Sequence, residues 1–353
     1  MASITDSVLL GAAGAGGGGG GSQTITDVAV AHFGGYQLSA WPFTSGVGFG
    51  AAYANPPFVG GTGRGVSFSS DSIAVTYDSS PWLRVLPFTS GVGFGTPYTN
   101  PAYVDALVGT CVKFSPSGND IAVGLNSSPY VSAYSFTSGV GITSKYSAPS
   151  SPPTAQVNDV KFSPNGAAIA MARGGLSPYM DAYNFTTGVG FGAKYSNPSP
   201  APNSTSYGCG FSPAGDLFGI AYSNSPRVSV YDFNSSTGFG SKYADPSTPL
   251  TSNGYSVAFT STDIAIGFAA SPYIHVYPFT PGVGFGAKYS DPSILPTGRV
   301  ENIAFTSTDI GLQYIGTGRF RVFPFTTGVG FGSPYSFPSY GGSGTYDIDF
   351  RTE

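Results

Sequence analysis

The sequence predicts an all-β fold: a seven-bladed β-propeller of four-stranded blades, closed by a C-terminal strand that completes the first blade. Three observations predict it. One motif recurs seven times at a nearly constant spacing, each repeat contains four short segments of β type, and the two chain ends carry complementary parts of one repeat. The propeller is expected to cover residues 23–353, after a flexible Gly-rich tail at residues 1–22.

The recurring motif is "FTSGVGFG", which starts at Phe43 and returns almost unchanged at Phe88. Its first Phe recurs at steps of 45, 48, 49, 48, 46 and 46 residues. A Tyr stands ten residues after each of these Phe residues: Tyr53, Tyr98, Tyr146, Tyr195, Tyr243, Tyr289 and Tyr335. Self-similarity at a period of about 40–50 residues is typical of propeller blades, so seven copies predict seven blades.

One repeat, residues 157–199, shows how four strands arise. "DVKFS" alternates apolar and polar residues and ends at a Pro-Asn-Gly turn, and "AAIAMA" is a short apolar segment. "SPYMDAYNF" carries paired aromatic residues, and "GFGAKYS" follows the glycine turn. None of these segments has helical periodicity, and Gly, Pro, Asn and Ser separate them. Four short strands per repeat are the content of a propeller blade.

The two ends of the chain predict how the ring closes. After the glycine run, "TDVAVAHF" matches the second strand "TDIAIGFA" at Thr262, so the first repeat lacks an inner strand. The chain ends with "TYDIDFRTE", which matches inner strands such as "GYSVAFTST" at Gly254. We therefore expect the C-terminal strand to pair beside residues 25–33 and to leave no open sheet edge between the first and last blades.

Several segments resemble those of WD40-like propellers. They are the inner-strand turns "VKFSPSG" at Val112, "VKFSPNG" at Val160 and "GFSPAG" at Gly210, and the third strand "VSVYDF" at Val228. The resemblance extends over nearly the whole chain and implies the same architecture. The Trp-Asp dipeptide and the Gly-His signature of that family are absent, so the resemblance implies no particular partner.

The glycine motif also resembles a phosphate-binding loop, because a Lys follows it in four copies: Lys145, Lys194, Lys242 and Lys288. A phosphate loop places its glycines between a strand and a helix whose N-terminal amides bind the anion. Here the residues after the glycines remain strand-like. We therefore interpret the motif as a tight turn in which glycine permits positive φ, and we expect no nucleotide site.

Composition excludes two classes of function. The charged fraction is 9%, against about 25% in an average domain, and the net charge is −4 with no basic stripe, so we expect no nucleic-acid partner. The apolar run "VLLGAA" is too short to span a bilayer and lacks a basic flank. Cys111 and Cys209 point to opposite faces of their strands, which predicts buried free thiols rather than a disulfide.

Candidate catalytic residues are few. His32 and His275 stand in different repeats, with no Cys or Glu at metal-ligand spacing. Glu occurs only at Glu301 and Glu353, which leaves no paired-Glu site for acid–base chemistry. Asp recurs where second strands begin, and turn hydrogen bonds explain its recurrence: Asp27, Asp120, Asp263 and Asp309. We expect the chain not to be an enzyme and to need no cofactor or metal.

The turn between the second and third strands presents an aromatic residue in six repeats and an Arg in the fifth. These residues are Tyr36, Trp82, Tyr130, Tyr179, Arg227, Tyr273 and Phe320. On one face of a propeller, such a ring could stack against sugar rings or contact a protein, because aromatic side chains combine an apolar body with a polar tip. Packing against the neighbouring blade explains the same residues, so both interpretations remain open.

The N-terminal segment contains four apolar residues, here called the hook residues, before a flexible Gly-rich linker: Ile4, Val8, Leu9 and Leu10. Its style, "LLGAAGAGGGG", resembles the N-termini of bacteriophage tail and virion-surface proteins. The resemblance implies a non-enzymatic display protein of a virion, anchored to other virion or appendage proteins through residues 1–22, with a surface glycan or host receptor as a further partner. The expected location is the virion or the extracellular space. The alternatives are a secreted or cell-surface glycan-binding propeller, a tail without a partner and, least favoured, a propeller enzyme such as a lactonase or glycosidase.

Overall fold

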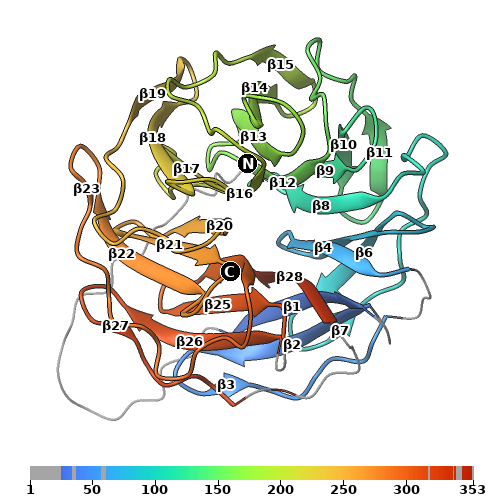
Figure 1. Cartoon of the computed structure of the whole chain (residues 1–353). Helices are drawn as coiled ribbons and strands as arrows, with labels where there is room; N and C mark the ends of the chain where they lie inside the picture. The colour runs from blue at the N-terminus through green and yellow to red at the C-terminus, as the bar shows by residue number, and fades with distance from the viewer. Residues whose placement is uncertain are drawn as a thin grey trace, which may run out of the picture.

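The computed structural model describes residues 25–33, 37–56, 61–316, 319–336, 338 and 344–351. Its strands form seven four-stranded antiparallel sheets, arranged as blades in a ring around a central axis (Figure 1). The predicted all-β, seven-bladed propeller is confirmed. Within these residues, no helix is long and apolar enough to cross a membrane.

Each blade has an inner, a second, a third and an outer strand, counted from the axis. The inner strands are β28 (Gly344–Arg351), β4 (Gly63–Phe68), β8 (Gly109–Phe114), β12 (Val157–Phe162), β16 (Ser206–Phe211), β20 (Gly254–Phe259) and β24 (Val300–Phe305). The second strands are β1 (Ile25–Phe33), β5 (Ser72–Tyr77), β9 (Asp120–Leu125), β13 (Ala168–Arg173), β17 (Leu217–Tyr222), β21 (Asp263–Phe268) and β25 (Asp309–Tyr314).

The outer half of each blade is less regular. The third strands are β2 (Leu38–Thr44), β6 (Leu83–Thr89), β10 (Val131–Thr137), β14 (Met180–Thr186), β18 (Val228–Asn234), β22 (Ile274–Thr280) and β26 (Phe320–Thr326). The outer strands are β3 (Gly48–Phe49), β7 (Gly93–Phe94), β11 (Gly141–Lys145), β15 (Gly190–Lys194), β19 (Gly238–Lys242), β23 (Gly284–Phe285) and β27 (Gly330–Phe331).

The hydrophobic core lies between the blades. In β13, for example, every residue is buried, because both faces of a second strand are covered by neighbouring sheets. One apolar cluster joins Val131 of β10 to Met171 of β13, which belong to adjacent blades. Short, mainly apolar second strands are therefore what this architecture requires, and the repeated sequence supplies them.

The ring closes as predicted. Strand β28 pairs antiparallel with β1, with Val28 opposite Phe350 and Val30 opposite Ile348, and Figure 1 shows these two strands side by side in one blade. The closing strand also contacts the next blade, since the carboxylates of Asp347 and Asp349 each accept a backbone N–H of β4 at 2.8 Å. Blade 1 is thus assembled from both ends of the chain.

The repeated Tyr and the glycine turn form a joint between neighbouring blades. The hydroxyl of Tyr146 donates to Asp120 in its own blade at 2.6 Å and accepts the N–H of Gly188 in the next blade at 3.0 Å. Gly190 lies against the ring of Tyr146 at a φ of +100°, and a Cβ there would come within 2.7 Å of the Tyr146 Cβ. The glycines are therefore needed for positive φ and close approach, which agrees with the interpretation of the motif as a turn.

We expect Tyr195→Ala to cost about 2–4 kcal/mol of unfolding free energy, as for other aromatic truncations in packed sites. The Tyr195 side chain is buried, and its hydroxyl donates to Asn184 at 2.9 Å. Tyr195→Phe keeps the ring and is the control, with an expected cost of about 1 kcal/mol for the lost hydrogen bond. Denaturant unfolding followed by circular dichroism measures both. Equal losses for the two variants would show that the ring itself contributes nothing.

Candidate functional site

The repeats differ from one another along the channel on the axis of the ring. The sixth residue of every inner strand is Phe in blades 2–7, and Phe350 has the same place in β28. The residues four positions before these Phe residues vary between basic, acidic, polar and aromatic: Arg64, Thr110, Asn158, Tyr207, Tyr255, Glu301 and Tyr346. Six of these seven line the narrow polar channel. The sevenfold pattern is therefore lost where side chains face the axis, as expected for one specific site rather than seven equal ones.

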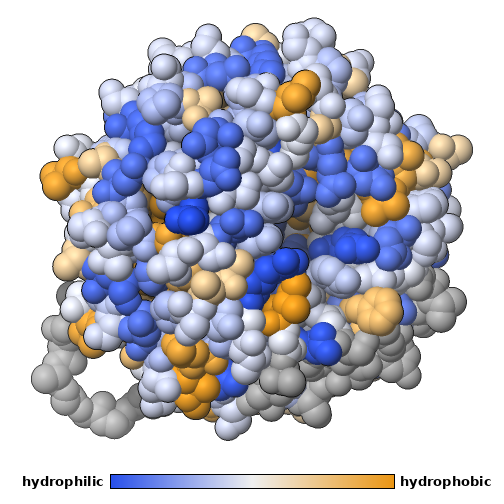
Figure 2. All heavy atoms as spheres, viewed as in Figure 1, coloured by the Kyte–Doolittle hydropathy of each residue, from blue (hydrophilic) through white to orange (hydrophobic). Residues whose placement is uncertain are grey.

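At the end of the channel where the inner strands begin, the channel opens into a basin of about 610 Å³. The basin is lined by Arg64, Asn158, Tyr207, Tyr255, Glu301 and Tyr346, among others. Figure 2 shows one face of the disc, on which hydrophilic residues gather around the centre and hydrophobic residues form only small separate groups. The basin has the size and the convergent polar groups of a small-molecule site.

Glu301 is held on one side only. Its Oε1 accepts hydrogen bonds from Arg299 Nε at 2.9 Å and from Arg299 Nη2 at 2.6 Å, whereas Oε2 makes no hydrogen bond within the described part of the chain. The guanidinium of Arg299 in turn lies over the ring of Tyr255 at 4.6 Å. Burial lowers the pKa of Arg299, but the Glu301 carboxylate outweighs it and the pKa is raised. One carboxylate oxygen is oriented and the other is left for a ligand.

A second cation, Arg64, faces the same basin. Its guanidinium stacks on the ring of Tyr346 at 4.6 Å and makes a long contact of 3.5 Å with Asp78. Its Nε is buried and has no hydrogen-bond partner among the described residues. Because the Arg64 side chain is 36% exposed, the accessible N–H groups of its guanidinium are suited to donate to a bound anion or carbonyl group.

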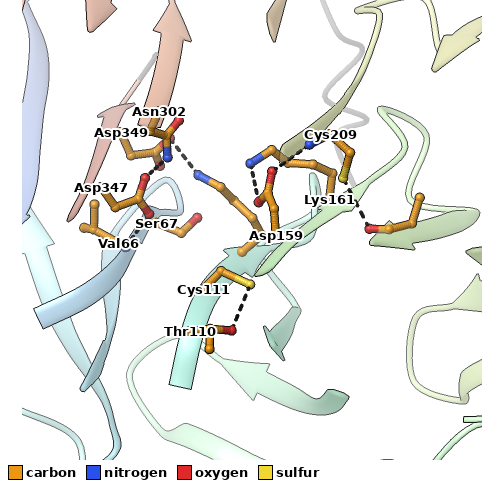
Figure 3. Close-up of polar contacts among 12 residues, drawn as sticks. Val66, Ser67, Thr110, Cys111, Asp159, Lys161, Cys209, Asn302, Asp347 and Asp349 are labelled. Atoms are coloured by element: carbon orange, nitrogen blue, oxygen red, sulfur yellow. Dashed lines mark hydrogen bonds and ion pairs between the residues drawn. The ribbon is translucent and has the colours of Figure 1, made fainter. Parts of the chain in front are cut away.

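Deeper in the channel lies a compact cluster of charged residues (Figure 3). Lys161 pairs with Asp159 at 2.8 Å, and Lys113 pairs with Asp349 at 3.1 Å. Although burial acts to lower it, the pKa of Lys161 is raised because the Asp159 carboxylate is so close. Asp347 has no lysine of its own and accepts a hydrogen bond from Asn302. Burial raises the pKa of Asp347 to about 6, against the lowering effect of the two lysines.

The predicted aromatic ring does not line this basin. Trp82, Tyr130, Tyr179, Arg227 and Tyr273 are half-buried at positive φ of 61° to 73°, and none of them is among the basin residues. Tyr130 and Tyr273 pack against the hydrophobic clusters of their blades, which favours the packing interpretation for these two. Tyr36 and the hook residues Ile4, Val8, Leu9 and Leu10 lie outside the described residues.

Phe320 is not an exposed member of that ring. It is fully buried and packs on Trp41 with ring centroids 5.3 Å apart, because it is the first residue of β26 and faces the core. The residues with the matching positive φ are Gln37 in blade 1 and Arg319 in blade 7. The equivalent turn position is defined by the positive φ of the backbone. Aligning the repeats by their aromatic residues instead chose Tyr36 and Phe320, each of which is one residue away from that position in the sequence.

The other candidates are structural. Both histidines are buried, with His32 hydrogen-bonded to Ser39 and His275 to Tyr277, and burial lowers the pKa of His275 to about 4. Cys111 and Cys209 are buried free thiols, as predicted. The described residues contain no group of three or more His, Cys, Asp or Glu side chains placed to hold a metal ion.

Sequence reasoning missed the basin residues Arg64, Arg299 and Glu301. Glu301 was considered only as half of a paired-Glu site, which is too narrow a criterion. The signal was present in the repeats themselves: when the inner strands are aligned, charged and aromatic residues replace one another at a single position. In a repetitive chain, the positions that break the repeat are the ones to examine.

Comparison with known proteins shows the fold. No protein-family model matches the chain, and no curated protein matches its sequence. The chain is similar in structure to a "putative 6-phosphogluconolactonase" of Bacteroides uniformis, with a TM-score of 0.66 and 12% identity over 93% of this chain and 100% of that one. A periplasmic gluconolactonase of Pseudomonas aeruginosa gives a TM-score of 0.65 and 12% identity, covering 93% and 99%.

This comparison overturns two expectations. The neighbours carry the names of lactonases, which are hydrolases, so the expectations of a non-enzymatic display protein and of no enzyme are wrong. Nothing in the comparison supports the resemblance to bacteriophage tail proteins or the glycan-binding alternative. That resemblance rested on a low-complexity tail, and composition of this kind carries little information about function.

Proposed function

We propose that the chain is a lactonase, a hydrolase that opens the ring of a sugar lactone in the basin. The observation that carries this proposal is the break in the repeat at the basin, which brings Glu301 and two arginines together with stacked tyrosines at one end of the channel. The names of the structural neighbours support the same reaction class.

The chemistry assigns a role to each charged group. Oε2 of Glu301 accepts a proton from water, whose oxygen then bonds to the lactone carbonyl carbon. The guanidinium of Arg64 stabilises the negative charge that develops on the carbonyl oxygen. When the bond from the carbonyl carbon to the ring oxygen breaks, the ring oxygen takes the proton from Glu301, and the product is an open hydroxy acid. Arg299 positions Glu301 by holding Oε1.

The tyrosines provide the surface for the sugar ring. Tyr207 and Tyr255 stack with ring centroids 4.4 Å apart and an interplanar angle of 23°, so together with Arg299 they form a rigid three-layer stack at the wall of the basin. Both faces of the Tyr255 ring are covered in this stack, so the tyrosines present their polar edges to the hydroxyls of a sugar. The rigid wall fixes the orientation of the lactone relative to Glu301.

Hydrolysis of gluconolactone and 6-phosphogluconolactone, followed by acid release at constant pH, tests the proposal. We expect Glu301→Gln to lower kcat/KM by roughly 10²–10⁴-fold, the usual contribution of a general base. The amide retains an acceptor for Arg299, so the fold should be preserved. Lys288→Met is the control, because Lys288 pairs with Asp291 away from the basin. Hydrolysis no faster than the uncatalysed rate, or full activity in Glu301→Gln, would contradict the proposal.

A further inference from the structure

The opposite end of the channel also opens into a cavity, of about 350 Å³. This lower cavity lies where the inner strands end and turn into the second strands, so the length of the inner strands separates it from the basin. Its charged lining residues are Lys113, Lys161 and Arg351. The two lysines are the fifth residues of the inner strands of blades 3 and 4, and they border both the lower cavity and the channel.

The carboxylates that pair with these cations do not line the lower cavity. Asp349 contacts Lys113 and Asp159 contacts Lys161, but neither acid is among the residues that border the cavity. Both are held elsewhere by backbone amides: Asp349 accepts the N–H of Phe68, and Asp159 accepts the N–H of Cys209 at 3.0 Å. The charged residues that a ligand in the cavity could contact are therefore all cationic.

The two ammonium groups have donors to spare. An ammonium carries three N–H groups, and within the described chain Lys113 and Lys161 each donate one hydrogen bond to a carboxylate. Both side chains are mostly buried, with exposed fractions of 16% and 23%. In the low-dielectric surroundings of a partly buried site, a hydrogen bond from a charged donor is stronger than at an open surface.

Part of the wall of the lower cavity is apolar, and serines such as Ser69, Ser70 and Ser115 form another part. The apolar part is formed by the repeated Phe residues near the ends of the inner strands in blades 1–4. These residues border the cavity and are each less than 10% exposed: Phe350, Phe68, Phe114 and Phe162. In the facing blades the fifth position is small, with Gly210, Ala258 and Ala304. A cationic patch beside an apolar wall matches a ligand with a charged head and an apolar body.

We propose that the lower cavity is a second binding site, for a small organic anion whose carboxylate or phosphate contacts Lys113 and Lys161 and whose apolar body packs on the phenylalanines. The site does not depend on the proposed lactonase activity, since it shares neither Glu301 nor the two arginines of the basin.

Isothermal titration calorimetry of the full chain with phenyl phosphate, benzoate, inorganic phosphate and benzyl alcohol tests the proposal. We expect phenyl phosphate or benzoate to bind. Inorganic phosphate and benzyl alcohol should bind at least tenfold more weakly, since the first lacks the apolar body and the second lacks the anionic group. The two aromatic anions distinguish a phosphate site from a carboxylate site.

The paired variant Lys113→Met with Asp349→Asn removes one ammonium without leaving a buried carboxylate unpaired. The new amide oxygen at position 349 can still accept the hydrogen bond from the Phe68 N–H. We expect it to weaken binding at least tenfold. The matched control is Lys242→Met with Asp245→Asn, the same exchange at an ion pair elsewhere, and it should bind normally. Ser117→Trp, a change in an exposed turn at the cavity, blocks the site even if the first variant does not fold.

Arg64→Met separates this site from the basin. Binding that survives Arg64→Met but is lost in Ser117→Trp supports the proposal. Binding lost in Arg64→Met alone would place the anion in the basin and overturn the proposal, as would the absence of binding of every anion at millimolar concentration. Since Glu301→Gln should bind the anion normally, failure of the lactonase proposal and failure of this one give different results.

Discussion

Deletion of residues 345–353 is expected to abolish cooperative folding of the ring. The deletion removes β28, including the buried side chains of Ile348 and Phe350, and exposes the edge of β1. Loss of a buried Ile costs about 2–5 kcal/mol and loss of a buried Phe about 3–5 kcal/mol. Together with the lost strand pairing, this approaches the whole stability of a domain, roughly 5–15 kcal/mol.

Thermal melting followed by circular dichroism checks this expectation. The truncated chain should show no sharp transition, or one at a much lower temperature. Phe350→Ala, which keeps the backbone pairing with Val28, should give an intermediate loss. Removal of residues 1–22 is the control, because the composition of that segment predicts no part in the ring. Unchanged melting after the C-terminal deletion would refute closure by β28.

The pH dependence of stability should change when Asp347 is replaced by Asn. Burial raises the pKa of Asp347 from 3.8 to about 6. The folded state therefore binds this proton more tightly than the unfolded state, and the stabilisation is complete below about pH 4 and lost as the pH rises through 6. With about 1.4 kcal/mol for each pKa unit, the group changes stability by on the order of 3 kcal/mol across this window.

Urea denaturation of both proteins between pH 4 and pH 8 measures the effect. His275 titrates in the same window with the opposite sign, because its pKa is lowered to about 4 and its contribution is lost as the pH falls below 6.5. The difference between the wild-type and Asp347→Asn curves cancels that contribution and isolates Asp347. We expect the wild-type protein to gain stability relative to the variant as the pH falls from 7 to 5. A difference that does not vary with pH would contradict the assignment, and Asp245→Asn, an exposed acid, is the control.

Much of the fold could be predicted from the sequence because each repeat is a local unit. The period of the motif fixes the number of blades, and the match of "TDVAVAHF" to second strands assigns the missing inner strand to the C-terminus. The function of Tyr146 and its equivalents was only partly predictable. Its recurrence in every repeat indicates a shared role, but its hydrogen bonds to Asp120 and to Gly188 join residues that are 26 and 42 positions away.

The candidate site was not predictable in the same way. Arg64, Glu301 and Tyr346 come from blades 2, 7 and 1, and they face one basin only because the ring closes. Phe320 was misjudged because a one-residue shift on a strand exchanges the core face for the exposed face. The sequence alone determines the repeat, the strands and the closing partner, since these depend on local periodicity and on the matching of similar segments. Only the tertiary structure decides which of the residues that break the repeat meet at the axis, because their proximity depends on the curvature of seven packed sheets.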